Sequence, residues 1–117
     1  MFWNKGSKKA DKDKDSVEDQ AVIVSFDTDG NVDLIQKSIA KITDGLEQEL
    51  ISIGAEYDGD EYGDNECNMY FYGPDADRIL QVIQPSLESM RWRPIRIKIR
   101  YGDVNNATAI EEARRIV

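Results

Sequence analysis

Strand and helix signals alternate along the chain once its first twenty residues are passed. Residues 21–26 (AVIVSF) form a β-branched run of strand length. Isoleucines and leucines then recur at steps of three and four, which predicts a helix with a single apolar stripe. This stripe consists of Ile35, Ile39, Ile42, Leu46, Leu50 and Ile53. Gly54 follows the stripe and is a typical C-cap residue.

The middle of the chain again shows strand signals followed by a helix signal. A short strand is predicted over residues 55–58, and residues 68–72 alternate apolar and polar side chains as a second strand. The polar stretch between these strands reverses the chain. Gly73 and Pro74 then open a helix, which Pro85 should kink or end near Gln84. Its apolar residues are Ala76, Ile79, Leu80, Ile83, Leu87 and Met90.

The clearest strand covers residues 95–101, where isoleucine or tyrosine alternates strictly with arginine or lysine. Such alternation is typical of a strand with one face buried and the other in water. A short helix is predicted from Ala107 to Ile116. The order β-α-β-β-α-β predicts an α+β, ferredoxin-like split β-α-β fold. We therefore expect a four-stranded antiparallel sheet with two helices on one face, followed by a short C-terminal helix.

The start of the chain lacks any such pattern. Residues 4–19 contain five lysines and five acidic residues, with Val17 as their single large apolar side chain. Such a stretch cannot bury enough apolar surface to offset its ordering entropy. We expect a disordered charged tail over residues 1–19 and a single α+β domain over residues 20–117.

Charge narrows the classes of partner. The 117-residue chain has a formal net charge of −8, and residues 44–77 contain eleven acidic residues and no basic one. Residues 78–101 reverse this balance, with six basic residues against Glu88 alone. An acidic chain repels nucleic-acid phosphates and attracts basic surfaces. We therefore expect a basic protein partner rather than nucleic acid.

Residues that usually carry chemistry are scarce. The chain has one cysteine, Cys67, and no histidine, which excludes an internal disulfide, Ser-His and Cys-His nucleophiles and the commonest transition-metal ligand. We expect no cofactor and no metal site. No apolar run approaches the roughly 20 residues of a membrane span, and no signal peptide is recognisable, so we expect a cytoplasmic location.

One turn resembles a catalytic motif. The segment Asp27-Thr28-Asp29-Gly30 follows a strand, as does the first motif of the haloacid-dehalogenase-like phosphatases. That resemblance implies a nucleophilic Asp27, a general acid at Asp29 and magnesium between them. The antiparallel pattern downstream and the short chain do not suit that family, and a strand-to-helix turn explains the same residues. We therefore expect a protein that is not an enzyme.

A second segment resembles a calcium loop of the EF-hand type. Counted from Asp58, Asp60 and Gly63 occupy suitable positions, but Tyr62 replaces the fifth ligand and Met69 the twelfth. A solvated hairpin loop is the simpler interpretation.

The bare side of the expected sheet is a candidate ligand surface. If Met69 and Phe71 point into the core, five side chains share the opposite face: Tyr70, Tyr72, Arg96, Lys98 and Arg100. Aromatic and cationic residues on such a face resemble the RNA-recognition modules, which stack bases there. The alternative interpretations are an RNA- or small-ligand-binding module, a homodimer through this open face, and a plain solvated surface.

The acidic loop is the favoured partner site. Its residues are Glu56, Tyr57, Asp58, Asp60, Glu61, Tyr62, Asp64 and Glu66. Tyrosine supplies contact area at low entropic cost, and a focused acidic patch speeds association with a basic protein. The sequence thus favours a non-enzymatic binding protein that docks a basic partner through Tyr57 and Tyr62, with solubilising charge as the alternative.

The stretches EYDGDEYG (residues 56–63) and YGPDAD (residues 72–77) resemble those of a group of small bacterial proteins without known activity. The similarity covers roughly residues 21–101. It implies a bacterial protein of this topology and transfers no site. By analogy, small acidic bacterial proteins without catalytic machinery often neutralise basic toxin domains, which would make this protein immunity-like.

Overall fold

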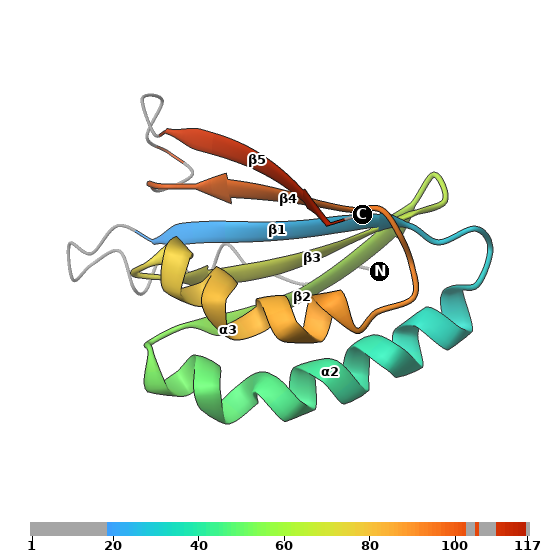
Figure 1. Ribbon diagram of the computed structural model, residues 1–117, viewed down its shortest axis with the longest axis horizontal. Helices are drawn as coiled ribbons and strands as arrows, with labels where there is room; N and C mark the ends of the chain where they lie inside the picture. Colours follow the sequence, from blue (N-terminus) through green and yellow to red (C-terminus); the bar gives the residue numbers. More distant parts are fainter. Residues whose placement is uncertain (1–18, 103–104, 106–109, 117) are drawn as a thin grey trace.

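The computed structural model describes residues 19–102, 105 and 110–116. They form one five-stranded antiparallel sheet with two helices on one face (Figure 1). The elements are β1 (Gln20–Asp27), α2 (Val32–Ser52), β2 (Glu56–Gly63), β3 (Glu66–Gly73), α3 (Ala76–Glu88), β4 (Ile95–Arg100) and β5 (Glu111–Ile116). The strand order is β2-β3-β1-β4-β5, so β2 and β5 are the two edges.

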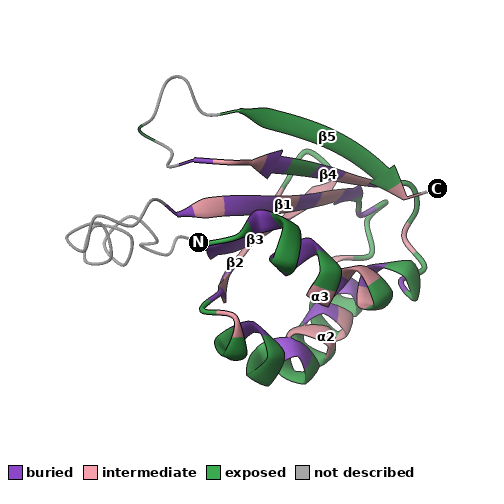
Figure 2. Ribbon diagram, turned by 60° about the vertical axis from the view of Figure 1, so that its left-hand side comes forward, coloured by how far each residue is buried: buried purple, intermediate pink, exposed green. Residues whose placement is uncertain are grey.

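The core forms around β1, which pairs with β3 on one side and β4 on the other. Val24 lies opposite Met69 of β3 and Ile97 of β4, so apolar side chains from three strands point to the same face. Val22, Val24 and Phe26 are completely buried there. The two helices cover this face of the sheet (Figure 2). Burying each such side chain stabilises the fold by about 1.5–3 kcal/mol.

Both helices present the predicted apolar stripes to this face. In α2, four stripe residues are buried and Ile42 and Ile53 pack partly buried at the edge of the core. Five of the six apolar residues predicted for the second helix lie in α3, Met90 follows its end, and all six are buried. The Asp75 carboxylate caps the first turn by accepting a hydrogen bond from the Arg78 N–H at 3.2 Å. Gly54 has a φ of +74°, which lets the chain leave α2 toward β2.

The predicted four-stranded ferredoxin-like sheet is wrong, because the sheet has a fifth strand where a C-terminal helix was expected. Residues 111–116 pair with β4 along its whole length. Glu, Ala and Arg favour helix, but the exposed edge of β4 offers backbone partners, and tertiary pairing overrides such weak preferences. The start of the expected helix, residues 107–109, lies outside the described residues.

Two boundaries also differ from expectation. The acidic segment is mostly strand: β2 runs for eight residues, and Asp64 and Asn65, with φ of +53° and +62°, form the turn into β3. Helix α3 continues through Pro85 to Glu88, because Leu87 is fully buried and its packing offsets the backbone bond that proline removes. The expected tail lies outside the described residues except for Asp19, which is buried.

Two glycines should respond in opposite directions to substitution by alanine. A Cβ at Gly73 would lie 2.9 Å from the Ala55 Cβ and 3.0 Å from its Cα, whereas a Cβ at Gly45 would meet nothing within 4 Å. We expect Gly73→Ala to lower the free energy of unfolding by about 1–3 kcal/mol through overpacking. Gly45→Ala, in the middle of α2, should raise it by about 0.5–1 kcal/mol. Urea unfolding followed by circular dichroism measures both, and equal effects would contradict the packing described here.

Candidate functional site

The strand register gathers all five predicted open-face residues on the side of the sheet away from the helices, called the open face below. Tyr70, Ile23 and Lys98 form one row across β3, β1 and β4, and Tyr72, Ala21 and Arg100 form the next. Arg96 lies in the row beyond, opposite Ser25. The placement expected from alternation is therefore found.

The two tyrosines of this face do not form a free stacking platform. Tyr72 is only 5% exposed, and burial raises its pKa to about 12. The hydroxyl of half-buried Tyr70 donates a hydrogen bond to Glu61 Oε1 at 2.5 Å. A base needs an exposed ring to stack on, so this arrangement does not favour the RNA-binding interpretation.

The cations of the open face are largely engaged by acceptors of the sheet and its loops. Arg96 forms ion pairs with Asp27 at 3.3 Å and with Glu66, and Lys98 pairs with Glu111 of β5 at 3.6 Å. Arg100 Nε donates to the Gly102 carbonyl. The positive charges of Arg96, Lys98 and Arg100 are therefore compensated by acidic side chains and a carbonyl group that the fold brings close to them.

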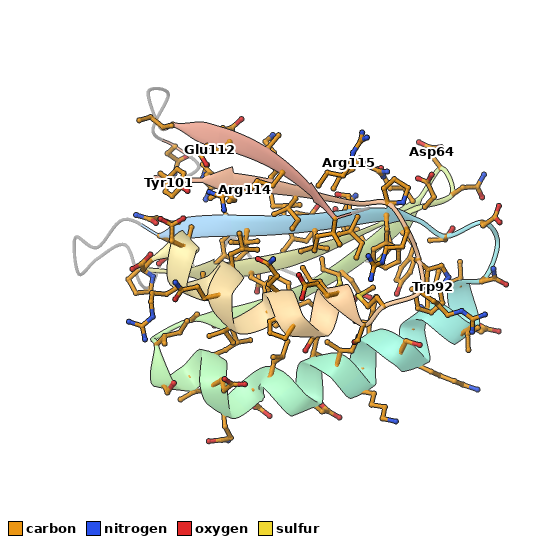
Figure 3. All side chains as sticks on the ribbon, viewed as in Figure 1. Asp64, Trp92, Tyr101, Glu112, Arg114 and Arg115 are labelled. Carbon is orange, nitrogen blue, oxygen red and sulfur yellow. The ribbon has the colours of Figure 1, made fainter. Side chains whose placement is uncertain are left out.

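The predicted acidic site is split between the two sides of β2. Tyr57, Asp60 and Tyr62 lie opposite Phe71, Met69 and Cys67, on the side that the helices cover. Glu56 and Glu61 face the other side, opposite Tyr72 and Asn68, and Asp64 stands at the free end of the hairpin (Figure 3). Asp58, at the bulge in β2, is buried. The expected outward loop is therefore wrong.

The two tyrosines expected as outward anchors are half-buried. The Tyr57 ring packs on Phe71 with centroids 5.1 Å apart, and the Tyr62 hydroxyl donates to Asp60 Oδ2 at 2.7 Å. Burial raises the pKa of both hydroxyls, as do the neighbouring Asp60 and Cys67. Burial also raises the pKa of the adjacent Cys67 thiol to about 12, which keeps it protonated and unreactive at neutral pH.

Two hollows lie along β2 and together form a surface called the acidic flank below. One, of about 410 Å³, lies between α2 and β2 and is lined by Thr43, Asp44, Glu47, Leu50, Ile51, Ala55, Glu56 and Tyr57. The other, of about 540 Å³, lies at the hairpin and is lined by Asp60, Glu61, Tyr62, Gly63, Asp64, Glu66 and Asn68. Among these described lining residues there is no lysine or arginine.

Sequence reasoning missed the part of the flank that comes from α2. Asp44, Glu47 and Ile51 are spaced by three and four residues and so lie on one side of the helix. This spacing was a usable signal, but which strand lies beside that side follows only from the packing of α2 against β2.

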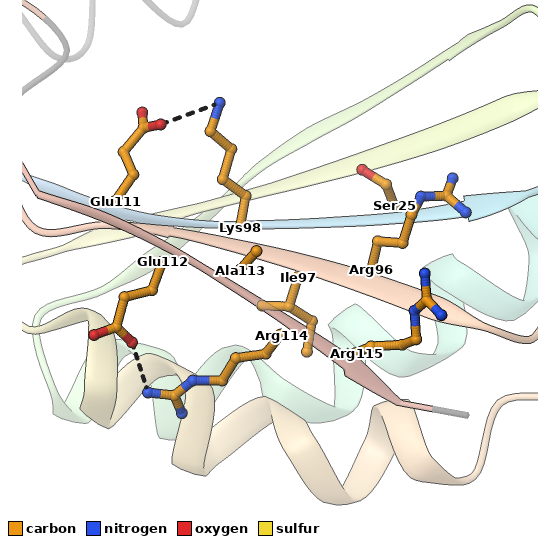
Figure 4. Close-up of a pocket in the computed structure, with 9 residues that line it drawn as sticks. All are labelled: Ser25, Arg96, Ile97, Lys98, Glu111, Glu112, Ala113, Arg114 and Arg115. Atoms are coloured by element: carbon orange, nitrogen blue, oxygen red, sulfur yellow. Dashed lines mark hydrogen bonds and ion pairs between the residues drawn. The ribbon is translucent and has the colours of Figure 1, made fainter.

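A third, shallow hollow of about 640 Å³ lies over β4 and β5 (Figure 4). Its lining includes Lys98 and Arg96 of β4 and the charged residues of β5. The sequence does not predict this hollow, because the composition of the β5 segment favours a helix.

The aspartates of the phosphatase-like turn are both exposed. Asp27 pairs with Arg96, and Asp29 occupies a tight turn with φ of +53°. In the described ranges, no group of three or more His, Cys, Asp or Glu side chains could hold a metal ion.

Comparisons with protein-family models, curated proteins and solved structures found no match to this chain. The resemblance to the group of small bacterial proteins therefore stays an expectation. Neither described helix has the length and apolar character needed to cross a membrane.

The buried hydroxyls and thiol make stability sensitive to alkaline pH. The Cys67 thiol has a pKa near 9.0 when unfolded and about 12 when folded, and Tyr72 shifts from 10.0 to about 12. The unfolded state therefore releases protons that the folded state retains, so stability should be constant below about pH 9 and fall as pH rises toward about 12.

Urea unfolding at about pH 8, 10 and 11, with tyrosinate absorbance recorded in parallel, measures this dependence. Tyrosinate should appear together with unfolding. A urea midpoint that does not change up to pH 11 would show that these groups titrate freely in the folded protein.

Proposed function

We propose that this protein is a non-catalytic binding protein that docks a basic protein partner along its acidic flank. The observation that carries the proposal is the pair of hollows beside β2, both lined by carboxylates and neither by a described lysine or arginine. With a net charge of −8, the protein attracts a basic partner at long range, and these hollows supply the short-range contacts.

The hollow between α2 and β2 suits a lysine or arginine side chain. Leu50 and Ala55 are buried at its floor, and Ile51 is 58% exposed beside them. These apolar atoms match the methylene stem of a basic side chain. The exposed carboxylates of Asp44 and Glu47 suit its charged end.

The residues of the acidic flank contribute to the proposed docking surface in other ways than the sequence predicts. Tyr57 contributes to a hollow rather than projecting as an anchor, and Asp58 is too buried for direct contact. Asp64 is exposed at the hairpin, and Glu61 lines the same hollow. A neutraliser of a basic toxin domain is one class of protein that needs such a surface, and it is the class that we propose.

A defined basic probe tests the flank. The probe is a peptide of alternating lysine and valine, titrated into isotope-labelled protein and followed by amide chemical shifts. We expect the largest shifts in residues 43–66. The variant Asp44→Asn, Glu47→Gln, Asp64→Asn should bind about tenfold more weakly, because exposed charge pairs contribute about 0.5 kcal/mol each.

The matched control neutralises three exposed acids that line neither hollow: Asp33→Asn, Glu49→Gln and Glu88→Gln. It changes the net charge equally, and its affinity for the peptide should stay near that of the unmodified protein. An equal loss in both variants would show that net charge alone drives binding and would reject the flank as the site.

A further inference from the structure

The edge strand β5 is unusually bare. All of Glu111–Arg115 is exposed, and Ile110 just before it is 67% exposed. The helices cover the sheet from β2 to β4, and β5 lies beyond them (Figure 2). This strand therefore buries little apolar surface, and within the described part of the chain its outer edge has no partner strand.

No described strand pairs with the outward edge of β5. The Tyr101 N–H donates to the Ile110 carbonyl at 2.8 Å, so this pair belongs to the hydrogen-bonded set between β4 and β5. Such pairs alternate along an antiparallel ladder. Glu112 and Arg114 therefore bond toward β4. The N–H and C=O groups of Glu111, Ala113 and Arg115 consequently point away from the sheet, where another strand can bind them.

The sequence of this edge complements itself. Residues 110–116 read I-E-E-A-R-R-I, which is a palindrome about Ala113 with the charges inverted. If two copies pair antiparallel about Ala113, each charge meets its opposite. Glu111 then faces Arg115 of the second copy, Glu112 faces its Arg114, and Ile110 faces its Ile116.

Among the two-fold antiparallel pairings of residues 111–115, the register centred on Ala113 is the favourable one. A two-fold axis through any other residue from 111 to 115 would place Glu or Arg directly opposite its own copy, and like charges in that position are destabilising. A two-fold axis between two residues would place a residue that bonds away from β4 opposite one that bonds toward β4. Residues paired across an antiparallel ladder must both bond toward each other or both away, so this arrangement is not allowed. Only the Ala113 axis satisfies both conditions.

Pairing would also relieve a like-charge contact within the sheet. Arg96 of β4 lies directly opposite Arg115 of β5 on the open face. Arg96 has Asp27 and Glu66 as ion-pair partners, whereas Arg115 has no such partner among the described residues. Figure 4 shows Arg115 beside Arg96 at the shallow hollow. Glu111 of the second copy would lie on the outer side of Arg115.

We propose that two copies of this chain associate edge to edge through β5, in antiparallel register about Ala113, to form one continuous sheet of ten strands. Isologous pairing of this kind is the usual symmetry of a homodimer. It uses the edge of the sheet and leaves the open face uncovered. Because β2 is the opposite edge, the two acidic flanks lie at the far ends of the dimer.

Charge exchange tests this register. The proposal expects the unmodified chain to reach twice its mass of 13.3 kDa in sedimentation velocity as concentration rises at low salt. The variants E111K/E112K and R114E/R115E should each dissociate about a hundredfold more readily, because four opposite-charge pairs become like-charge pairs. An equimolar mixture of the two variants restores every pair and should form a heterodimer.

Two further measurements keep the test independent of folding. Circular dichroism establishes that each variant is folded, and Ala113→Pro removes an outward N–H without touching the β4–β5 bonds, so it should be monomeric. Amide exchange at Glu111, Ala113 and Arg115 should slow only in the dimer. A monomer at every concentration, a mixture that fails to associate, or a dimer in which these three amides exchange freely would overturn the proposal.

Discussion

The double pairing of β1 organises this molecule. Strand β1 is hydrogen-bonded to both β3 and β4. The complete burial of Val22, Val24 and Phe26 therefore determines which side chains of all three strands point into the core. A slip of one residue would turn these side chains to solvent and bring Ile23 and Ser25 into the core, so the register is strongly specified. The order of charges across the open face, and the separation of β2 from β5, follow from that register.

The two edges of the sheet carry different chemistry. The β2 edge, with the adjoining part of α2, has carboxylates without a described basic neighbour in its hollows, whereas β5 carries both signs in mirrored order. An edge of one sign repels its own copy and attracts a basic surface, while a mirrored edge attracts its own copy. The proposed dimer and the proposed docking surface therefore do not compete. Two flanks on one assembly would raise the effective affinity for a partner with repeated basic sites.

Sequence reasoning located most of the buried positions but misjudged the segments whose structure depends on a neighbour. The stripes of α2 and α3 and the alternation of β4 were readable, since each follows the period of its own element. The Glu, Ala and Arg residues of the segment 111–116 favour a helix. The polar run from Asp58 to Cys67 predicts a reversal of the chain rather than a long strand. In the structure, residues 111–116 form the edge strand β5 and residues 58–63 lie in the edge strand β2. A partner strand supplies the hydrogen bonds there, and local preference counts for little.

The candidate site shows the same division. Local pattern already specified the acidic composition of residues 56–66, the shared face of Tyr70 and Lys98, and the scarcity of catalytic side chains, because these depend on residue type and period alone. Tertiary structure decided that Tyr57 turns inward onto Phe71, that Asp44 and Glu47 border the same hollow, and that Arg96 is neutralised by Asp27 and Glu66. These are contacts between residues distant in the chain, and they depend on how strands and helices pack, which no local spacing encodes.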